Sequence, residues 1–121
     1  MIAMNRVKVF HEETVEEGRR LSATVIELGN SYIVLLSEGD EENLGTLAVS
    51  IPSRLELSRL PLSSILLGER NTITARLIAE RLAAFTNKIV LVSTFLKTIN
   101  EVKAGQVFLR LLEKIMKEKE A

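Results

Sequence analysis

The sequence predicts an α+β fold: a mainly antiparallel sheet of about six strands, arranged as a β-sandwich or a two-layer sheet and flanked by two helices. Three observations lead to this class. Short apolar, β-rich runs separated by Gly, Asn and acidic turns occupy most of the chain up to Leu67. Two longer segments, 71–86 and 102–119, repeat apolar residues at steps of three and four, as helices do. One further apolar run lies between them, so the order of elements is βββββαβα.

Size and composition are those of one small domain. The 121 residues show no linker-like change in composition, so a single domain over residues 1–121 is expected. The chain has no cysteine, which excludes disulfides, thiolate metal clusters and a cysteine nucleophile. Basic and acidic residues number 16 each, so the net charge is zero and nucleic-acid binding is not expected.

The apolar runs are too short for a membrane segment. The longest have about five residues, against the roughly 20 that span a bilayer. Charge also appears too soon after the amino end for a signal peptide. A cytoplasmic protein is therefore expected, and the absence of cysteine and tryptophan with 26% charged residues would suit a thermophile.

The amino-terminal part is expected to begin with an edge strand over residues 5–12, in which Lys8 discourages further pairing. Residues 12–18, which hold four glutamates, are expected as a polar turn. The glutamates could serve a metal or a partner, but a solvated connection is the favoured interpretation.

A β-hairpin is predicted over residues 20–37, closed by Gly29 and Asn30 with a positive φ at Gly29. Its second strand is apolar at every position from Tyr32 to Leu36. An antiparallel strand with one wet face would alternate, so this strand is expected to be covered on both faces.

Residues 45–51 are expected to form the next strand, and the segment that follows this strand allows two interpretations. It runs from Pro52 to Pro61 and spaces three leucines among charged residues. It is either an irregular segment or edge strand that packs its leucines under the core, or a loop whose leucines contact a partner.

Residues 63–67 return to strand, and Gly68 lets the chain turn into the first helix, which Asn71 or Thr72 can cap. Polar side chains form only a narrow stripe on this helix, so it is expected to be buried between layers or at a subunit interface. Asn87 tolerates the left-handed conformation that ends a helix.

The last two elements are a strand over residues 89–96, apolar on both faces at its start, and the amphipathic helix 102–119. The first of these is expected to be central in the sheet. The lysine-rich end of the second suits the helix dipole.

Nothing in the sequence indicates bond-breaking chemistry. His11 is the only histidine, which excludes a two-histidine metal site or mechanism, and no G-x-S-x-G motif is present. The acidic clusters lie in polar turns where nothing raises a carboxylate pKa. No catalytic residue, metal ligand or cofactor is predicted, and a protein that is not an enzyme is expected.

Five motifs carry a family resemblance. They are L-A-V-S-I-P-S-R (47–54), P-L-S-S-I-L-L-G-E (61–69), R-L-I-A-E-R-L-A (76–83), T-N-K (86–88) and V-L-V-S (90–93). In this order and at these distances they resemble the small eukaryotic proteasome assembly chaperones numbered three and four, the fourth above all. The resemblance covers the chain from Gly45 to its end, with weaker agreement through the hairpin.

The resemblance implies two antiparallel sheet layers flanked by two helices, dimerisation, and binding to proteasome α-subunits so that the α-ring assembles correctly. In eukaryotes the family forms a heterodimer of two relatives. A single chain that resembles both could form a homodimer, as would suit an archaeal homologue. The larger assembly chaperones use a hydrophobic-tyrosine-x tail, whereas this chain ends K-E-K-E-A, so docking by such a tail is not expected.

Partner binding is predicted at Arg54, Leu57 and Arg59 in the segment between the prolines and at Glu69 and Arg70 before the first helix. An alternative of a different kind is a small dimeric scaffold of the roadblock or longin type that binds a GTPase or another protein complex. A hydrolase that uses His11 is a distant third.

Overall fold

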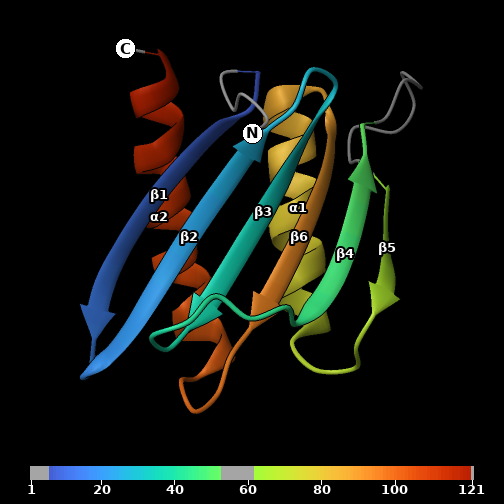
Figure 1. Cartoon of the computed structure of the whole chain (residues 1–121). Helices are drawn as coiled ribbons and strands as arrows, with labels where there is room; N and C mark the ends of the chain where they lie inside the picture. The colour runs from blue at the N-terminus through green and yellow to red at the C-terminus, as the bar shows by residue number, and fades with distance from the viewer. Residues whose placement is uncertain (1–5, 53–61, 121) are drawn as a thin grey trace, which may run out of the picture.

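The computed structural model describes residues 6–52 and 62–120 of the chain, which form one six-stranded sheet and two helices (Figure 1). The elements in chain order are β1 (Lys8–Glu16), β2 (Arg19–Glu27), β3 (Ser31–Glu38), β4 (Thr46–Ile51), β5 (Leu62–Leu67), α1 (Thr72–Thr86), β6 (Ile89–Phe95) and α2 (Glu101–Glu120). The predicted class and the order βββββαβα are confirmed. Within the described chain the strands form one sheet layer, covered by one layer of helices, rather than two packed sheets.

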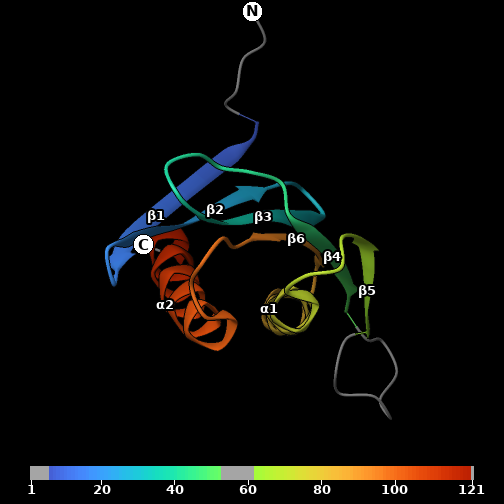
Figure 2. The ribbon, with the colours of Figure 1, turned by 90° about the horizontal axis from the view of Figure 1, so that it is seen from below.

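Both helices lie on the same face of the sheet (Figure 2). The strand order is β1-β2-β3-β6-β4-β5, and all neighbours are antiparallel except β3 and β6, which run parallel. The two middle strands are therefore the ones with continuous apolar runs, as expected for strands with covered faces. The prediction that residues 89–96 form a central strand is confirmed.

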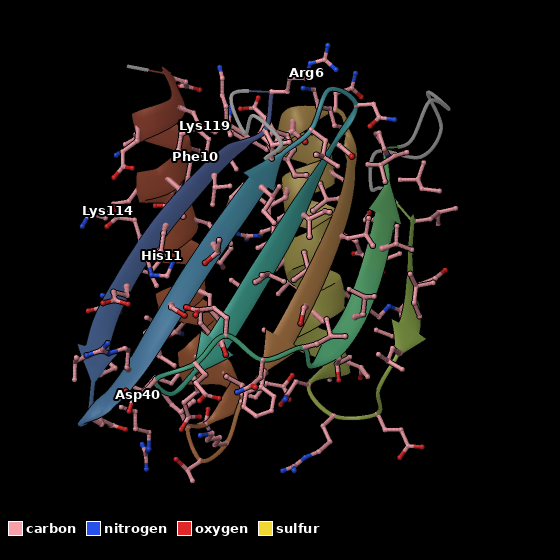
Figure 3. All side chains as sticks on the ribbon, in the orientation of Figure 1. Arg6, Phe10, His11, Asp40, Lys114 and Lys119 are labelled. Atoms are coloured by element: carbon pink, nitrogen blue, oxygen red, sulfur yellow. The ribbon has the colours of Figure 1, made fainter. Side chains whose placement is uncertain are left out.

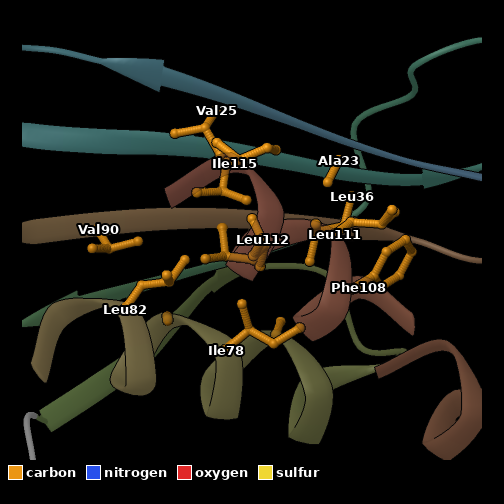
Figure 4. Packing of buried hydrophobic residues seen from close by; sticks show 14 of the residues in the cluster. Ala23, Val25, Leu36, Ile78, Leu82, Val90, Phe108, Leu111, Leu112 and Ile115 are labelled. Atoms are coloured by element: carbon orange, nitrogen blue, oxygen red, sulfur yellow. The ribbon is translucent and has the colours of Figure 1, made fainter. Parts of the chain in front are cut away.

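The hydrophobic core lies between the sheet and the helices (Figure 4). Its largest buried helix side chains are Phe108, Leu112 and Ile115 of α2 and Ile78 of α1. They cover fully buried sheet residues: Leu21, Ala23, Val25, Val34, Leu36, Val90 and Val92. Because side chains alternate along a strand, the residues between these point to the opposite face of the sheet.

The amino-terminal strand differs from the expectation. Residues 12–18 are not a polar turn: β1 continues to Glu16, and only Glu17 and Gly18 turn the chain, with φ of 53° and 76°. Two successive residues with positive φ are typical of a tight two-residue hairpin. Three of the four glutamates of this stretch therefore lie on a strand at the edge of the sheet, and Glu17 lies in the turn that follows it.

Lysines of α2 explain why glutamates are tolerated on this edge strand. Lys114 Nζ lies 3.4 Å from a carboxylate oxygen of Glu12, and Lys103 Nζ lies 3.8 Å from Glu16 and 2.7 Å from Glu17. These pairs are exposed and each stabilises the fold only weakly. Their position indicates that the acidic cluster meets the basic side of α2.

The predicted hairpin of β2 and β3 is confirmed, with Glu27 opposite Tyr32 and a 2.9 Å hydrogen bond from the amide of Leu28 to the carbonyl of Ser31. The expected positive φ at Gly29 is wrong, because the glycines with positive φ are Gly18, Gly39 and Gly68. The turn therefore needs no left-handed residue at Gly29.

The two ends of α1 are held differently. Asn71 precedes the helix with φ of 60° and its side chain makes no capping hydrogen bond, so the predicted cap is wrong. Instead, a carboxylate oxygen of Glu101 in α2 accepts hydrogen bonds from the amide of Thr74 at 3.1 Å and from its hydroxyl at 2.8 Å. At the other end the prediction for Asn87 is confirmed, with φ of 56°.

The connection between β6 and α2 is fixed by one buried carboxylate, Glu38 at the end of β3. Its oxygens accept hydrogen bonds from the amides of Lys97, Thr98 and Ile99 at 2.8, 3.0 and 3.1 Å, and from the hydroxyl of Thr98 at 2.8 Å. Burial by itself raises the pKa of the Glu38 carboxyl, but these donors lower it by more, so its pKa lies below the ordinary 4.5. Glu38 is therefore a charged anchor for the start of α2.

The carboxyl end of α2 is fixed to the sheet by Lys119 (Figure 3). Its ammonium lies 3.2 Å from Glu27, 5.7 Å from the ring centre of Phe10 and 5.3 Å from that of Tyr32. Burial lowers the pKa of Lys119, but the hydrogen bonds with Tyr32 and Glu27 raise it by more, so the net pKa is above 10.5. These contacts extend the packing of α2 beyond the apolar core.

Gly68, which directly follows β5, lets the chain lie close against Thr46 at the start of β4. It has φ of 94°, and a Cβ there would lie 2.6 Å from Thr46 Oγ1 and 2.9 Å from Thr46 Cα. Gly18 has a similar φ of 76° with nothing near its missing side chain. We expect Gly68→Ala to lower the free energy of unfolding by about 2–3 kcal/mol and Gly18→Ala by about 1 kcal/mol, measured by urea denaturation. Equal losses would show that the contact with Thr46 is unimportant.

Neither described helix is long and apolar enough to cross a membrane.

Candidate protein-interaction surfaces

The face of the sheet opposite the helices carries a row of apolar side chains. Ile26, Ile33, Leu91 and Val49 lie side by side on β2, β3, β6 and β4 because they are register partners. Each alternates with a buried residue of the helix side, and each is only half-buried. No helix of the described chain lies over this face (Figure 2), which we call the outer face.

The row ends in more exposed apolar residues. Val9 of β1 is the register partner of Ile26, and Ile51 of β4 lies at the other margin; both are 57% exposed. A contiguous apolar patch on a small soluble domain marks an interaction site. The expectation from the sequence that Tyr32–Leu36 needs cover on both faces is thus half met, since the described chain supplies a helix layer on one face only.

A second apolar surface lies on the helix layer. Ile73 and Phe85 of α1 are 77% and 66% exposed, and shallow pockets lie between them and Leu109 of α2. One side of α1 packs against the sheet and the other side is exposed in the described chain, so α1 is not buried between two layers there. The alternative, burial at a subunit interface, stays a prediction.

Two of the five predicted binding residues fall in the described chain. Glu69 and Arg70 are exposed in the connection between β5 and α1, where the carbonyl of Arg70 accepts a hydrogen bond from the Thr46 hydroxyl. Neither side chain forms an ion pair with another described residue. The other three, Arg54, Leu57 and Arg59, lie outside the described residues, so the structure does not place them.

The two predicted groups of binding residues adjoin opposite ends of β5 in the chain. The segment 53–61 enters β5 at Leu62, opposite Ile51, whereas Glu69 and Arg70 follow the far end of the strand. A strand of six residues is about 20 Å long. Both groups were predicted to bind the partner, and along the chain β5 connects one group to the other.

His11 lies on the outer side of β1 (Figure 3). Its Nδ1 is 2.7 Å from the Thr24 hydroxyl and its Nε2 is 3.2 Å from Glu13. The imidazole thus contacts a hydroxyl and a carboxylate, but Thr24 belongs to an inner strand whose amides serve the ladders with β1 and β3. Without free amides to stabilise an oxyanion, this arrangement does not support nucleophilic catalysis.

No cluster of three or more histidine, aspartate and glutamate residues in the described part of the chain is arranged to hold a metal ion. What this part offers instead is apolar surface and an open sheet edge, which are means of binding other proteins.

Comparison with known proteins agrees with this geometry. Residues 20–96 match the family model described as proteasome assembly chaperone 4. One similar solved structure is described as a novel chaperone complex for yeast 20S proteasome assembly; it has a TM-score of 0.67 and 15% identity over 95% of this chain and 96% of that one. This likeness confirms the fold. A search of curated proteins found no match.

The family match spans β2 to β6 and includes four strands that form the outer face, β2, β3, β6 and β4. It covers more than half of the chain, and it coincides with most of the region of the resemblance seen in the sequence. The chain belongs to the proteasome assembly chaperone 4 family.

Proposed function

We propose that this protein is a non-enzymatic, cytoplasmic assembly chaperone that binds proteasome α-subunits and promotes formation of the α-ring. The observation that carries the proposal is the match of residues 20–96 to the proteasome assembly chaperone 4 family. The same match favours this function over the roadblock or longin scaffold that the sequence also allowed. The exposed apolar surfaces support a role in protein binding rather than catalysis.

The protein works as a homodimer that joins through the outer face. The row of Ile26, Ile33, Leu91 and Val49 is flat, apolar and centred on the two middle strands, so two copies can pack it face to face at the usual spacing of about 10 Å between sheets. Such a dimer would form the two sheet layers that the family resemblance implies, one from each copy. A heterodimer with a related chain would use the same face.

The client contact is assigned to the two groups at the ends of β5. Glu69 and Arg70 are exposed and keep their charges free of ion pairs within the described chain. A chaperone must leave its client after assembly, so a partly polar contact of modest size is suited to the task. Segment 53–61 adds the predicted residues Arg54, Leu57 and Arg59.

The central test is to mix the purified chain with α-subunits from the same organism and to measure the mass of the mixture by size-exclusion chromatography with light scattering. A complex of the dimer with an α-subunit is expected at micromolar concentration. If each α-subunit elutes alone, the proposed function is wrong.

Replacing Arg54, Leu57 and Arg59 together by Ala should weaken α-subunit binding at least tenfold, because two charges and one apolar contact are removed. The dimer should stay intact, since these residues lie outside the outer-face row. The matched control replaces Val15, Arg19 and Arg20, also one apolar residue and two arginines, at the far end of the sheet. Equal weakening by both triple variants would argue against a client site in segment 53–61.

A further inference from the structure

The strand β5 forms an open edge of the sheet (Figure 1). Among the described strands it pairs with β4 alone. Its sequence, L-S-S-I-L-L, contains no charged residue, and Leu62 and Leu66 are 79% and 57% exposed. A free edge of this kind presents unpaired amides and carbonyls, and without charge it is a template for another strand.

The opposite edge of the sheet is protected. β1 carries Lys8 and three glutamates, Glu12, Glu13 and Glu16. Each of these glutamates, like the adjoining Glu17, lies within ion-pair distance of a basic side chain of β2 or α2. Charged side chains are a usual way to block edge-to-edge pairing. The contrast between the two edges indicates that β5, rather than β1, is available for pairing.

The backbone groups that face the open edge can be identified. The carbonyl of Leu62 accepts a 2.8 Å hydrogen bond from the hydroxyl of Ser50, so Leu62 points its backbone groups toward β4. Since these groups alternate along an antiparallel strand, Ser63 and Ile65 point theirs outward. The register changes beyond Ile65, where Leu66 is the extra residue of a bulge. The regular edge therefore runs from Leu62 to Ile65.

Each side of this edge carries one apolar residue and one serine. On the outer face, Leu62 lies opposite Ile51, both exposed apolar residues, and Ser64 lies opposite Val49. On the helix side, Ile65 packs against the core, and the Ser63 hydroxyl is hydrogen-bonded to Glu80 and accepts a 3.0 Å hydrogen bond from Arg76, both on α1. A strand that adds to this edge would therefore meet an apolar residue and a serine on each side.

We propose that β5 captures an extended segment of the client α-subunit by strand addition. This inference rests on the proposed function and names the part of the client that is bound. Continuity favours the client as occupant, because Glu69 and Arg70, the described residues of the proposed client contact, directly follow β5. Backbone pairing supplies affinity that tolerates sequence variation, and the exposed Leu62 and Leu66 supply apolar contacts.

The test measures amide hydrogen exchange of β5 by NMR, with and without α-subunit. Strand addition protects the outward amides of Ser63 and Ile65 at least tenfold, while the amides of Leu62 and Ser64, already directed to β4, change little. This alternation is expected only when a strand pairs with the edge, and a side-chain contact at the same place does not produce it.

The accompanying variant is Leu62→Lys, which puts a charge on the open edge and should weaken α-subunit binding at least tenfold. Its control is Val15→Lys, on the protected edge strand β1, where the residue is 62% exposed; this change should leave binding unaltered. The mass of each variant is measured first, so that a change in dimerisation is not scored as a loss of client binding.

The possible results separate the two proposals. If the α-subunit binds but Ser63 and Ile65 exchange as before, strand addition is wrong while the proposed function stands. If these amides are protected in the free protein at high concentration and exposed on dilution, a second copy occupies the edge and the inference fails. If no α-subunit binds at all, both proposals fail.

Discussion

Replacing Glu38 by Ala is expected to lower the free energy of unfolding by about 4 kcal/mol. The side chain is only 4% exposed, and its removal leaves the amides of Lys97, Thr98 and Ile99 without their acceptor in a buried place. These amides belong to the connection that starts α2, so the loss should extend to the packing of that helix. Urea denaturation followed by circular dichroism measures the change.

The control is Glu41→Ala, at an exposed glutamate that lies in the connection after β3. It should change the free energy of unfolding by less than about 0.5 kcal/mol. If Glu38→Ala lowered the free energy of unfolding no more than the control does, the amides of the connection would have to be hydrogen-bonded to water instead. The anchoring role of Glu38 would then be disproved.

The same residue makes stability depend on pH. Because the pKa of Glu38 is lower in the folded chain than the ordinary 4.5, the unfolded chain binds more protons between these two values. Its stabilising effect is therefore complete above about pH 5 and is lost as the pH falls through the folded pKa. Glu38→Gln should flatten the fall in unfolding free energy below about pH 5; an unchanged slope would contradict the lowered pKa.

Replacing Leu91 by Lys is expected to convert the proposed dimer into a monomer. Leu91 lies in the middle of the outer face, between Ile33 and Val49, on the central strand β6. A lysine there would bury its charge against apolar side chains of the second copy, which costs several kcal/mol. The dissociation constant of the dimer should therefore rise about a hundredfold or more. The half-exposed site in the single chain lets the variant fold.

Light scattering at micromolar concentration measures the mass, and circular dichroism checks the fold. The matched control is Val102→Lys, an apolar residue on the helix layer that is 70% exposed, which should leave the mass unchanged. A monomeric parent chain would overturn the dimer outright. Loss of the dimer in the Val102 variant alone would place the interface on the helices.

The elements that the sequence predicted well are those with a local physical signal. The apolar stripes of α1 and α2, the continuous apolar runs of β3 and β6, and the left-handed stop at Asn87 all depend on neighbours in the chain. Gly68 was also identified, because a turn into a helix after a strand needs a residue without a Cβ. Their bounds in the structure differ from the predicted ones by a residue or two.

The elements that the sequence misjudged depend on partners far along the chain. β1 was shortened in the prediction because nothing nearby explains its glutamates, whereas Lys103 and Lys114 come from α2. The cap of α1 was assigned to Asn71 or Thr72, but Glu101 supplies the acceptor. Nothing near Glu38 in the sequence indicates its role, and only the fold brings three amides to it.

The features of the candidate site also divide into those that local sequence predicts and those that depend on distant parts of the chain. Composition and periodicity alone predicted a small domain with more apolar surface than it can bury, and its motifs indicated the family. Only the tertiary structure decided which surface is left over: both helices cover one face, so Ile33 and Leu91 on the other face stay half-exposed. It also decided that β5 lies at an edge, because strand order follows from pairing between distant segments, which local sequence does not encode.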